Sequence, residues 1–203
     1  AAGWGGYVMA YSIESSNHAC YKDTLCLVNK LEIRDEATLA QVEGEITLIK
    51  AAEMETHPLI GDFSFAHYKR IHRFLFEDIY SWAGEIRDVD MSKKGTFFVG
   101  ADDIKHIATP LFARVQILSR PAKYSPDYAK KIAQAYHNVN MLHPFREGNG
   151  RTQRSFFTQL IRAAGFDIQF GNCDIDFLTI ATVQAAHGVQ DYLRKFFMES
   201  ISH

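Results

Sequence analysis

Hydrophobic residues recur every three or four positions along most of this chain, which is the spacing that lines one face of an α-helix. The first such stretch covers residues 37–52, and Pro58 marks the break beyond it. The second begins at Ser64, a residue type that caps helix N-termini, and is predicted to stop at Gly84. The inward faces are predicted to be Leu39, Val42, Ile46, Ile49 and Ala52 in the first helix, and Phe65, Tyr68, Ile71, Leu75, Ile79 and Trp82 in the second.

Further helices are predicted over residues 102–118, from about 126 to a point before Pro144, from about 150 to 164, and from about 174 to the end. The helix that begins near residue 126 is predicted to end before Pro144, because a residue that precedes proline avoids the α region. Gly165 is the predicted C-terminal cap of the 150–164 helix. Fifteen Phe and nine Tyr predict a core built largely on aromatic packing.

Between residues 85 and 100 the pattern changes to two short strands around a glycine turn, which predicts a β-hairpin. We therefore expect a mainly α, compact helical domain with one β-hairpin. No long linker divides the sequence, so a single domain is predicted over residues 1–203. Within it, residues 1–20 are interpreted as a loose tail or an expression remnant, and 174–203 as a C-terminal helical part.

Charge, cysteine content and hydropathy weigh against several function classes, although a small local basic patch stays possible. The net charge of −2 lacks the strong basic excess of a non-specific nucleic-acid binder. The three cysteines form no CxxC pair, which favours reduced residues of a cytoplasmic protein over a disulfide frame or a zinc site. No stretch approaches 18 uninterrupted apolar residues, so no membrane span is predicted.

Candidate chemistry is concentrated in residues 143–154, HPFREGNGRTQR, between two predicted helices. Gly148, Asn149 and Gly150 form a small-residue turn into a helix, where close backbone approach and the helix N-terminus make a cradle for phosphate; Asn149 is also a candidate cap. Arg151 and Arg154 are three residues apart on the first turn, and guanidinium groups suit the phosphates of a nucleotide.

Three further residues complete the loop. Glu147 precedes the cradle and can hold Mg²⁺, which commonly takes one carboxylate plus substrate oxygens. His143 has an ordinary pKa near neutrality, which suits proton removal from an attacking hydroxyl. Phe145 is expected to anchor the loop in the core. The other histidines are interpreted as ordinary core or surface residues, since no HExxH spacing is present.

This segment resembles the Fic family signature, HPFx[D/E]GNGRxxR, at every specified place. The stretch YSWAGEIR at residues 80–87 and the hairpin after it are similar to the family's WAG segment and flap. The resemblance covers roughly residues 31–170, the predicted Fic core.

The resemblance implies a protein adenylyltransferase, which moves AMP from ATP to a Ser, Thr or Tyr hydroxyl of a target protein and releases pyrophosphate. His143 would be the general base, and Glu147 would coordinate Mg²⁺ between the α- and β-phosphates. Gly148, Asn149 and Gly150 would form the anion hole, with Arg151 and Arg154 on the β- and γ-phosphates. The predicted ATP-binding set is Phe145, Glu147, Gly148, Asn149, Gly150, Arg151 and Arg154, and the predicted target-docking flap is Lys93, Lys94, Gly95, Thr96 and Phe97.

The resemblance also raises the question of inhibition. Fic proteins are commonly held inactive by a helix that carries [S/T]xxxE[G/N], whose glutamate would pair with Arg154 here. Glu43-Gly44 comes close, but the residue four places before Glu43 is Leu39. We therefore expect a separate, small antitoxin-like inhibitor that contacts Arg154, or an inhibitory segment that has been removed from this chain.

Other functions compete with this interpretation. A Fic-fold transferase of phosphate or phosphocholine is disfavoured, because relatives that transfer phosphate usually depart from the motif at the acidic and GNG positions. A catalytically silent peptide-binding module has no reason to keep the whole motif. A P-loop ATPase is excluded by the absence of GxxxxGK[ST]. The expected location is the bacterial cytoplasm, with secretion into a host cell as an alternative.

Overall fold

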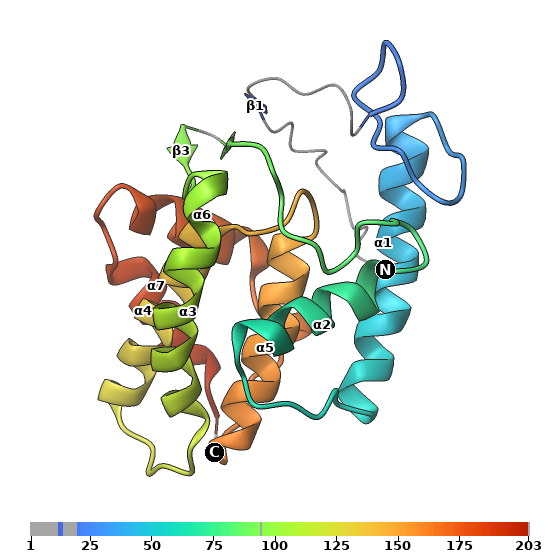
Figure 1. Cartoon of the computed structure of the whole chain (residues 1–203). Coiled ribbons are helices and arrows are strands. Elements are labelled where there is room, and N and C mark those ends of the chain that lie inside the picture. The colour runs from blue at the N-terminus through green and yellow to red at the C-terminus, as the bar shows by residue number, and fades with distance from the viewer. Residues whose placement is uncertain (1–11, 14–19, 94, 203) are drawn as a thin grey trace.

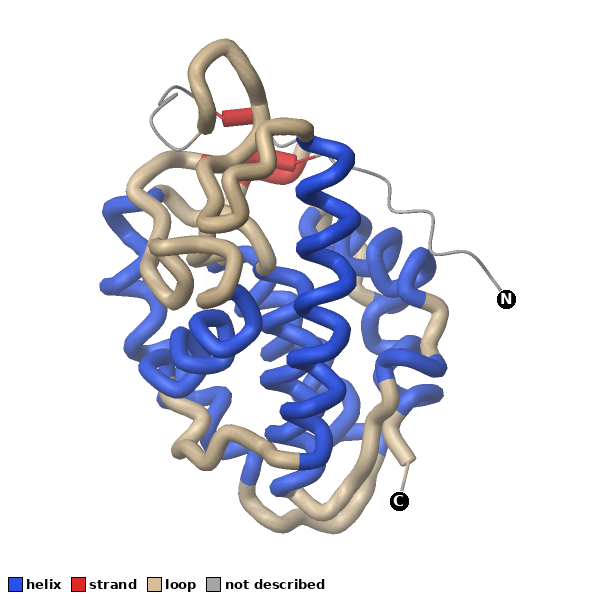
Figure 2. The backbone as a smooth tube through the Cα atoms, turned by 90° about the vertical axis from the view of Figure 1, so that its right-hand side faces the viewer, coloured by secondary structure: helices blue, strands red, loops and turns tan. Residues whose placement is uncertain are grey.

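The computed structural model of the chain describes residues 12–13, 20–93 and 95–202. Its elements form a helical bundle with a small sheet at one end (Figures 1 and 2). The helices are α1 (Glu36–Thr56), α2 (Phe65–Phe76), α3 (Ile104–Val115), α4 (Pro126–Leu142), α5 (Asn149–Ala163), α6 (Ile175–Ala186) and α7 (Asp191–Ser200). The strands are β1 (Ser12–Ile13), β2 (Met91–Lys93) and β3 (Thr96–Phe97). The mainly α fold with a hairpin is therefore confirmed.

Helix α5 occupies the centre of the bundle, where it packs against α2 and α4, and α4 in turn packs against α3, α6 and α7. Phe156, Phe157, Leu160 and Ile161 of α5 are fully buried, and Phe156 contacts the ring of Tyr68 at 5.1 Å between centroids. Aromatic side chains thus fill much of the core, as their number predicts. Because α5 packs against helices on both sides, the loop that precedes it is attached to a buried helix of the core.

The sheet is antiparallel in the order β1-β2-β3. The hairpin was predicted, although its strands are shorter than the pattern indicates: Ile86 and Val89 lie in the loop before β2. The pairing of β1 with β2, Ser12 opposite Ser92, was not predicted. Phe97 in β3 lies opposite Ser92, at the other edge of the sheet.

The predicted inward face of α1 is only partly right: Leu39 is buried and Ile46 packs against the core, but Ala52 is exposed. Ile49 is 68% exposed, whereas Glu43 and Thr47 are buried together with Leu39. The inward-facing row of α1 is therefore partly polar, and a count of apolar positions assigns the helix the wrong rotation. The reason lies in the functional site, where both polar side chains find partners.

Two predicted boundaries also need correction. Helix α2 begins after the Ser64 cap as predicted, but it ends at Phe76, and residues 77–84 form turns that end at Gly84 with φ of +83°. The single helical pattern after residue 174 is two helices, α6 and α7, separated at Gly188, whose φ is +93°. In the first case the hydrophobic period continues through the turns, because Ile79 and Tyr80 also pack in the core; in the second the residues 187–189 that separate the helices are exposed.

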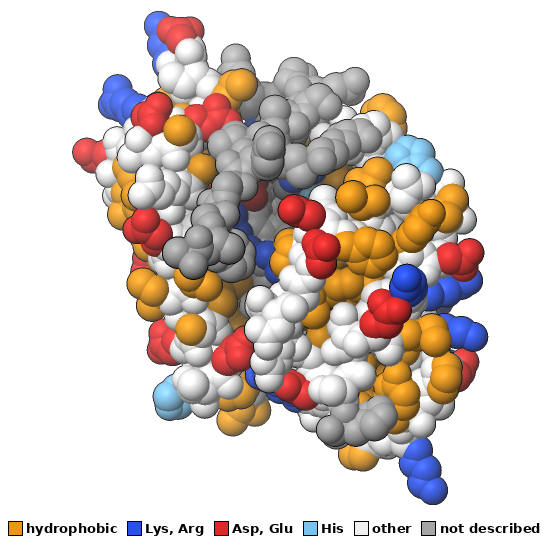
Figure 3. All heavy atoms as spheres, turned by 180° about the vertical axis from the view of Figure 1, so that it is seen from behind, with side chains coloured by type: hydrophobic (Ala, Val, Ile, Leu, Met, Phe, Trp, Pro, Cys, Tyr) orange, Lys and Arg blue, Asp and Glu red, His pale blue; other side chains and the backbone are white. Residues whose placement is uncertain are grey.

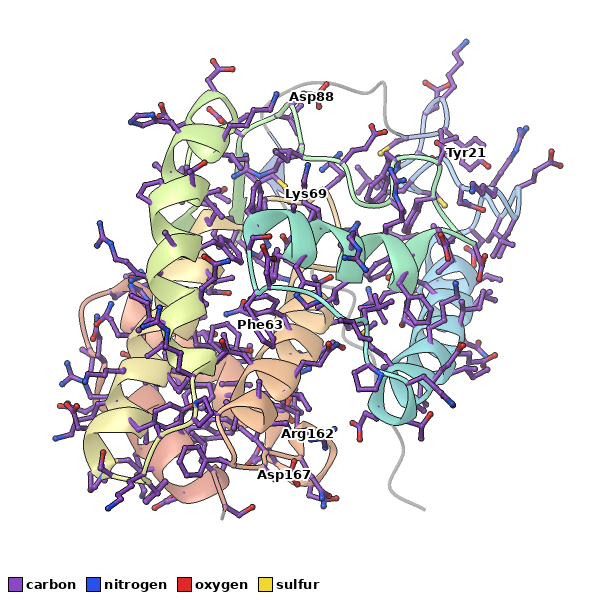
Figure 4. The ribbon with its side chains drawn as sticks, turned by 60° about the horizontal axis from the view of Figure 1, so that its bottom comes forward. Tyr21, Phe63, Lys69, Asp88, Arg162 and Asp167 are labelled. Atoms are coloured by element: carbon purple, nitrogen blue, oxygen red, sulfur yellow. The ribbon has the colours of Figure 1, made fainter. Side chains whose placement is uncertain are left out.

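The C-terminal part is fastened to the end of α5. Arg162 Nε lies 2.6 Å from Asp167 Oδ1 (Figure 4), and the backbone of Asp167 pairs with Ser202 in an antiparallel bridge. Within the described residues, no helix is long and apolar enough to cross a membrane.

Ser125 caps α4, the helix that ends at His143: its Oγ accepts a hydrogen bond from the Tyr128 N–H at 3.2 Å. Ser125→Ala is expected to lower the free energy of unfolding by about 1 kcal/mol, because one N–H of the first turn loses its acceptor. Urea denaturation measures this difference. Ser125→Asp keeps a capping oxygen and should stay close to the wild type; an equal loss in both variants would contradict the assignment.

Candidate functional site

The loop between α4 and α5 contains the motif, and its backbone leaves helical geometry at both ends. His143 follows α4 in the left-handed region, with φ of 43° and ψ of 59°. Gly148 precedes α5 with φ of +79°. A left-handed conformation is unfavourable for residues other than glycine, so His143 is held there by its surroundings. The predicted small-residue turn into a helix is confirmed.

Asn149 braces this loop rather than capping the helix. Its Oδ1 accepts a hydrogen bond from the Phe145 N–H at 2.9 Å, and its Nδ2 donates to the Phe145 carbonyl at 2.7 Å. The expected capping role is therefore wrong: Gly148 is the N-cap, and it has no side chain to cap with. Phe145 is fully buried and stacks on Tyr68 and His72, which confirms it as the anchor of the loop. The N–H groups of the first turn of α5 consequently lack intrahelical partners and form an anion-binding end.

His72, interpreted from sequence as an ordinary residue, joins the loop to the WAG segment. It is fully buried, and its Nδ1 accepts the Gly84 N–H at 2.8 Å. Its Nε2 therefore carries the proton and donates to the Glu147 carbonyl at 3.0 Å. Burial lowers the pKa of His72 to about 3, so the neutral ring persists at physiological pH. A charged ring would lose the Gly84 hydrogen bond.

Arg87 ties the same loop to both ends of the hairpin. Its Nε donates to the His143 carbonyl at 2.8 Å and its Nη1 to the Val89 carbonyl at 2.6 Å, while Nη2 donates to the Val99 carbonyl. Its backbone N–H donates to the Pro144 carbonyl at 2.9 Å. One buried guanidinium thus fixes the backbone of His143 relative to the residues that precede β2 and follow β3.

The tautomer of His143 is fixed by a backbone contact. Because a carbonyl oxygen only accepts hydrogen bonds, the 3.2 Å contact with the Asn140 carbonyl requires a proton on Nδ1, which leaves the lone pair on Nε2. The ring stacks on Phe98 with 3.7 Å between centroids. Burial lowers the pKa of His143 to about 3, and the charges of Lys93 and Arg87 act in the same direction. The imidazole is therefore neutral, the form that can take a proton, throughout the physiological range.

A cavity of about 210 Å³ opens beside this ring. Seen from behind, the surface is hollowed, and acidic and basic side chains are visible inside the hollow (Figure 3). The cavity brings together residues from the flap, α4, the start of α5 and α6. They are Lys93, Thr96, Phe98, Tyr136, Asn140, His143, Gly150, Gln153, Arg154, Leu178, Thr179, Thr182 and Val183.

The two motif arginines point to different places. Arg154 lines the cavity, and no carboxylate pairs with it among the described residues. Burial lowers its pKa, yet arginine remains a cation in proteins. Arg151 instead forms an ion pair with Glu43 of α1 and lies 3.5 Å from Glu147. The sequence places both arginines on one turn but does not distinguish their partners.

The surroundings of Glu147 suit a side chain that binds magnesium. Its Oε1 accepts the Gly148 N–H at 2.8 Å and contacts Arg151, while Oε2 has no hydrogen-bond partner in the described part of the chain. Burial and the neighbouring Glu43 raise the pKa of Glu147, and Arg151 opposes them. The described residues contain no group of three or more His, Cys, Asp or Glu that could hold a metal alone. An ion here would take most of its ligands from a nucleotide and water, as Mg²⁺ commonly does.

The predicted flap lies at the cavity mouth. Lys93 and Thr96 line the cavity, whereas Phe97 is 76% exposed on β3. Gly95 turns the hairpin with φ of +77°, and Lys94 lies outside the described residues. Within the described residues β3 pairs only with β2, so its outer edge keeps open backbone groups.

Sequence reasoning missed several residues of this site. Arg87, His72 and Glu43 come from distant segments, and no spacing relates them to the motif. The α6 wall of the cavity, from Leu178 to Val183, was also missed. The signals that the sequence did contain were the place of Arg87 in the YSWAGEIR stretch and the near match of Glu43-Gly44 to the inhibitory motif, and neither indicated these contacts.

Comparison with known proteins places this geometry in a family. A model of the Fic/DOC family matches residues 62–161. "Protein adenylyltransferase VbhT" of Bartonella schoenbuchensis is 33% identical over 89% of this chain, which spans 38% of that protein's length. "Probable protein adenylyltransferase y4lH" of Sinorhizobium fredii is 36% identical over 73% of this chain and 77% of its own length. A crystal structure of the BepC protein of Bartonella tribocorum, with bound AMPPNP, superposes with a TM-score of 0.83 at 25% identity, covering 91% of this chain and 96% of that one.

Gly148 is required by both conformation and space. A Cβ at Gly148 would lie 2.2 Å from Phe76 Cζ, whereas at Gly165, which also has positive φ, a Cβ meets nothing within 4 Å. Gly165→Ala is expected to cost about 1 kcal/mol of unfolding free energy from backbone strain alone. Gly148→Ala should cost about 1–3 kcal/mol more, because Phe76 must move. Chemical denaturation of both variants checks this, and equal losses would show that the contact with Phe76 imposes no constraint.

Proposed function

Because this chain belongs to the Fic/DOC family, we infer that it is a protein adenylyltransferase, which moves AMP from ATP to a hydroxyl side chain of another protein. The observation that carries this function is the joint placement of a neutral, tautomer-fixed His143, the N-terminus of α5 and Arg154 around one cavity. A base, an anion-binding helix end and a cation that no carboxylate of the described residues neutralises are what transfer of a nucleotidyl group to a hydroxyl needs.

The reaction runs as an in-line displacement at the α-phosphorus. The target hydroxyl oxygen attacks that phosphorus, its proton passes to His143 Nε2, and the bond to the α,β-bridging oxygen breaks to release pyrophosphate. The N–H groups at the start of α5 stabilise the charge that develops on the phosphate oxygens. Arg154 holds the distal phosphates. A contact between Arg151 and a phosphate stays a prediction, since its guanidinium pairs with Glu43 in this structure.

Magnesium is proposed as the cofactor, with Glu147 as its protein ligand. When bound, Mg²⁺ would neutralise phosphate charge and favour departure of pyrophosphate. Glu147 itself is oriented by the Gly148 N–H and by Arg151. The intact acidic and GNG positions favour transfer of AMP over transfer of phosphate or phosphocholine.

The target is proposed to dock on the flap by adding a strand. β1 already pairs with β2, so the outer edge of β3 is the side that this arrangement leaves for another chain. Backbone hydrogen bonds along β3 would give affinity and bring a hydroxyl toward His143, with Phe97 covering the docked segment.

Inhibition by a separate small protein remains our proposal. A glutamate that pairs with Arg154 has to come from outside the described residues, since none of their carboxylates reaches it. A toxin–antitoxin role in the bacterial cytoplasm agrees with that arrangement, and delivery into a host cell is the alternative that the effector relatives suggest.

The activity itself is tested with radiolabelled ATP, Mg²⁺ and a bacterial lysate. Label at the α-phosphate should appear on a protein band, and label at the γ-phosphate should not, which separates AMP transfer from phosphate transfer. His143→Ala is expected to lower the rate by at least about 10²-fold, the usual contribution of a general base. His106→Ala is the matched control, because His106 is an exposed histidine of α3. Transfer of γ-label, or equal rates in both variants, would contradict the proposal.

The proposed docking of the target on the outer edge of β3 is tested separately. Phe97→Ala is expected to raise the KM for the target about tenfold with little change in kcat, because an exposed aromatic side chain that a partner buries contributes about 1–3 kcal/mol. Nucleotide affinity should not change. Ile60→Ala removes an apolar side chain that is even more exposed, 90% accessible, and should leave KM unaltered. An unchanged KM in Phe97→Ala would place target docking elsewhere.

A further inference from the structure

Glu43 is a buried carboxylate in the inward-facing row of α1. Its side chain is 7% exposed and has two partners from different segments. The Tyr80 hydroxyl donates a hydrogen bond to Oε2, and the Arg151 guanidinium pairs with Oε1. A buried carboxylate is costly unless it is paired and hydrogen-bonded, and Glu43 meets both conditions.

Arg151 is held on several sides. Besides Glu43, its Nη1 donates to Thr47 Oγ1 at 3.1 Å, and its Cζ lies 4.9 Å from the centre of the Phe76 ring. The same Nη2 that pairs with Glu43 lies 3.5 Å from Glu147 Oε1. Arg151 thus links α1 to the motif loop. Its contacts with Glu43 and Thr47 of α1 are shorter than its contact with Glu147.

Two carboxylates therefore share one guanidinium. Without the charge of Glu43, the nearest anion for Arg151 is Glu147, four residues earlier in the chain. Arginine pairs with carboxylates through two parallel hydrogen bonds when geometry permits, which would engage both oxygens of Glu147. A divalent cation at Glu147 would then compete directly with Arg151. The pairing with Glu43 removes this competition.

We propose that Glu43, supported by Tyr80, is a positioning residue of the nucleotide site: it draws Arg151 toward α1 and so keeps the Glu147 carboxylate available to a divalent cation. This inference rests on the proposed function, because it assigns Glu147 as the protein ligand of that cation. It also gives Arg151 a task besides its predicted phosphate contact, because its position relative to Glu147 then decides whether that carboxylate can bind the cation.

The test measures binding of α,β-methylene-ATP by calorimetry, with Mg²⁺ and with EDTA. In this analogue a methylene replaces the oxygen between the α- and β-phosphates, so AMP is not transferred. In Glu43→Gln the gain in affinity that Mg²⁺ provides is expected to fall about tenfold or more, in the range that partners of metal ligands usually contribute. Affinity in EDTA should change much less. Glu45→Gln is the matched control, because Glu45 is exposed on the same helix and contacts Gln41.

A purely structural role for Glu43 predicts a different result. Affinities with Mg²⁺ and with EDTA would then fall by the same factor, or only the melting temperature would change, and either outcome overturns the inference. A wild-type chain that binds the analogue equally with and without Mg²⁺ would overturn the assignment of Glu147 and the proposed cofactor as well. A wild type that responds to Mg²⁺ beside an equally responsive Glu43→Gln overturns the role of Glu43 alone.

A second variant covers the case in which Glu43→Gln fails to fold. Tyr80→Phe keeps the buried ring, which stacks on Trp82 at 4.3 Å, and removes only the hydroxyl that donates to Glu43. The gain in affinity from Mg²⁺ should fall in the same direction and by a smaller factor. No change in this gain would mean that Tyr80 does not support Glu43.

Discussion

The arrangement of the site depends on the guanidinium of Arg87. A buried arginine needs acceptors for its donors, and here the carbonyls of His143, Val89 and Val99 provide them. These carbonyls belong to the motif loop and to the two ends of the hairpin, so satisfying one cation fixes three segments relative to one another. Loss of any of these contacts would leave a buried charge with an unfilled donor, which is why the flap and the loop behave as one unit.

The loop is braced by contacts within the protein before any ligand arrives. Asn149 closes a ring with the backbone of Phe145, and His72 holds the Glu147 carbonyl. The N–H groups at the start of α5 are the ones that helix geometry leaves without intrahelical acceptors. Donors that are fixed in advance need no reorganisation when charge develops on a phosphate, and this is the main advantage that an enzyme has over water.

Much of the fold was predictable because its helices carry an apolar period that matches their buried faces, as in α5, where the helical spacing of Phe157, Leu160 and Ile161 agrees with their complete burial. The motif was predictable because its chemistry is contiguous in sequence. Helix α1 was not, since Glu43 and Thr47 occupy buried positions that an apolar count treats as solvent-facing. Their burial depends on Arg151, more than 100 residues away, and no local pattern encodes such a pairing.

The position of His143 also depends partly on local sequence and partly on contacts with distant residues. Pro144 prevents the residue before it from continuing the helix, so α4 has to end here. Local sequence therefore determines that His143 leaves the helix, but not that it adopts φ of 43°, which is unfavourable for a side chain with a Cβ. That conformation is held by the Arg87 contact to its carbonyl and by the stacking of its ring on Phe98. Since Phe98 directly follows β3, the flap that is proposed to receive the target also orients the base, and docking and proton transfer share one support.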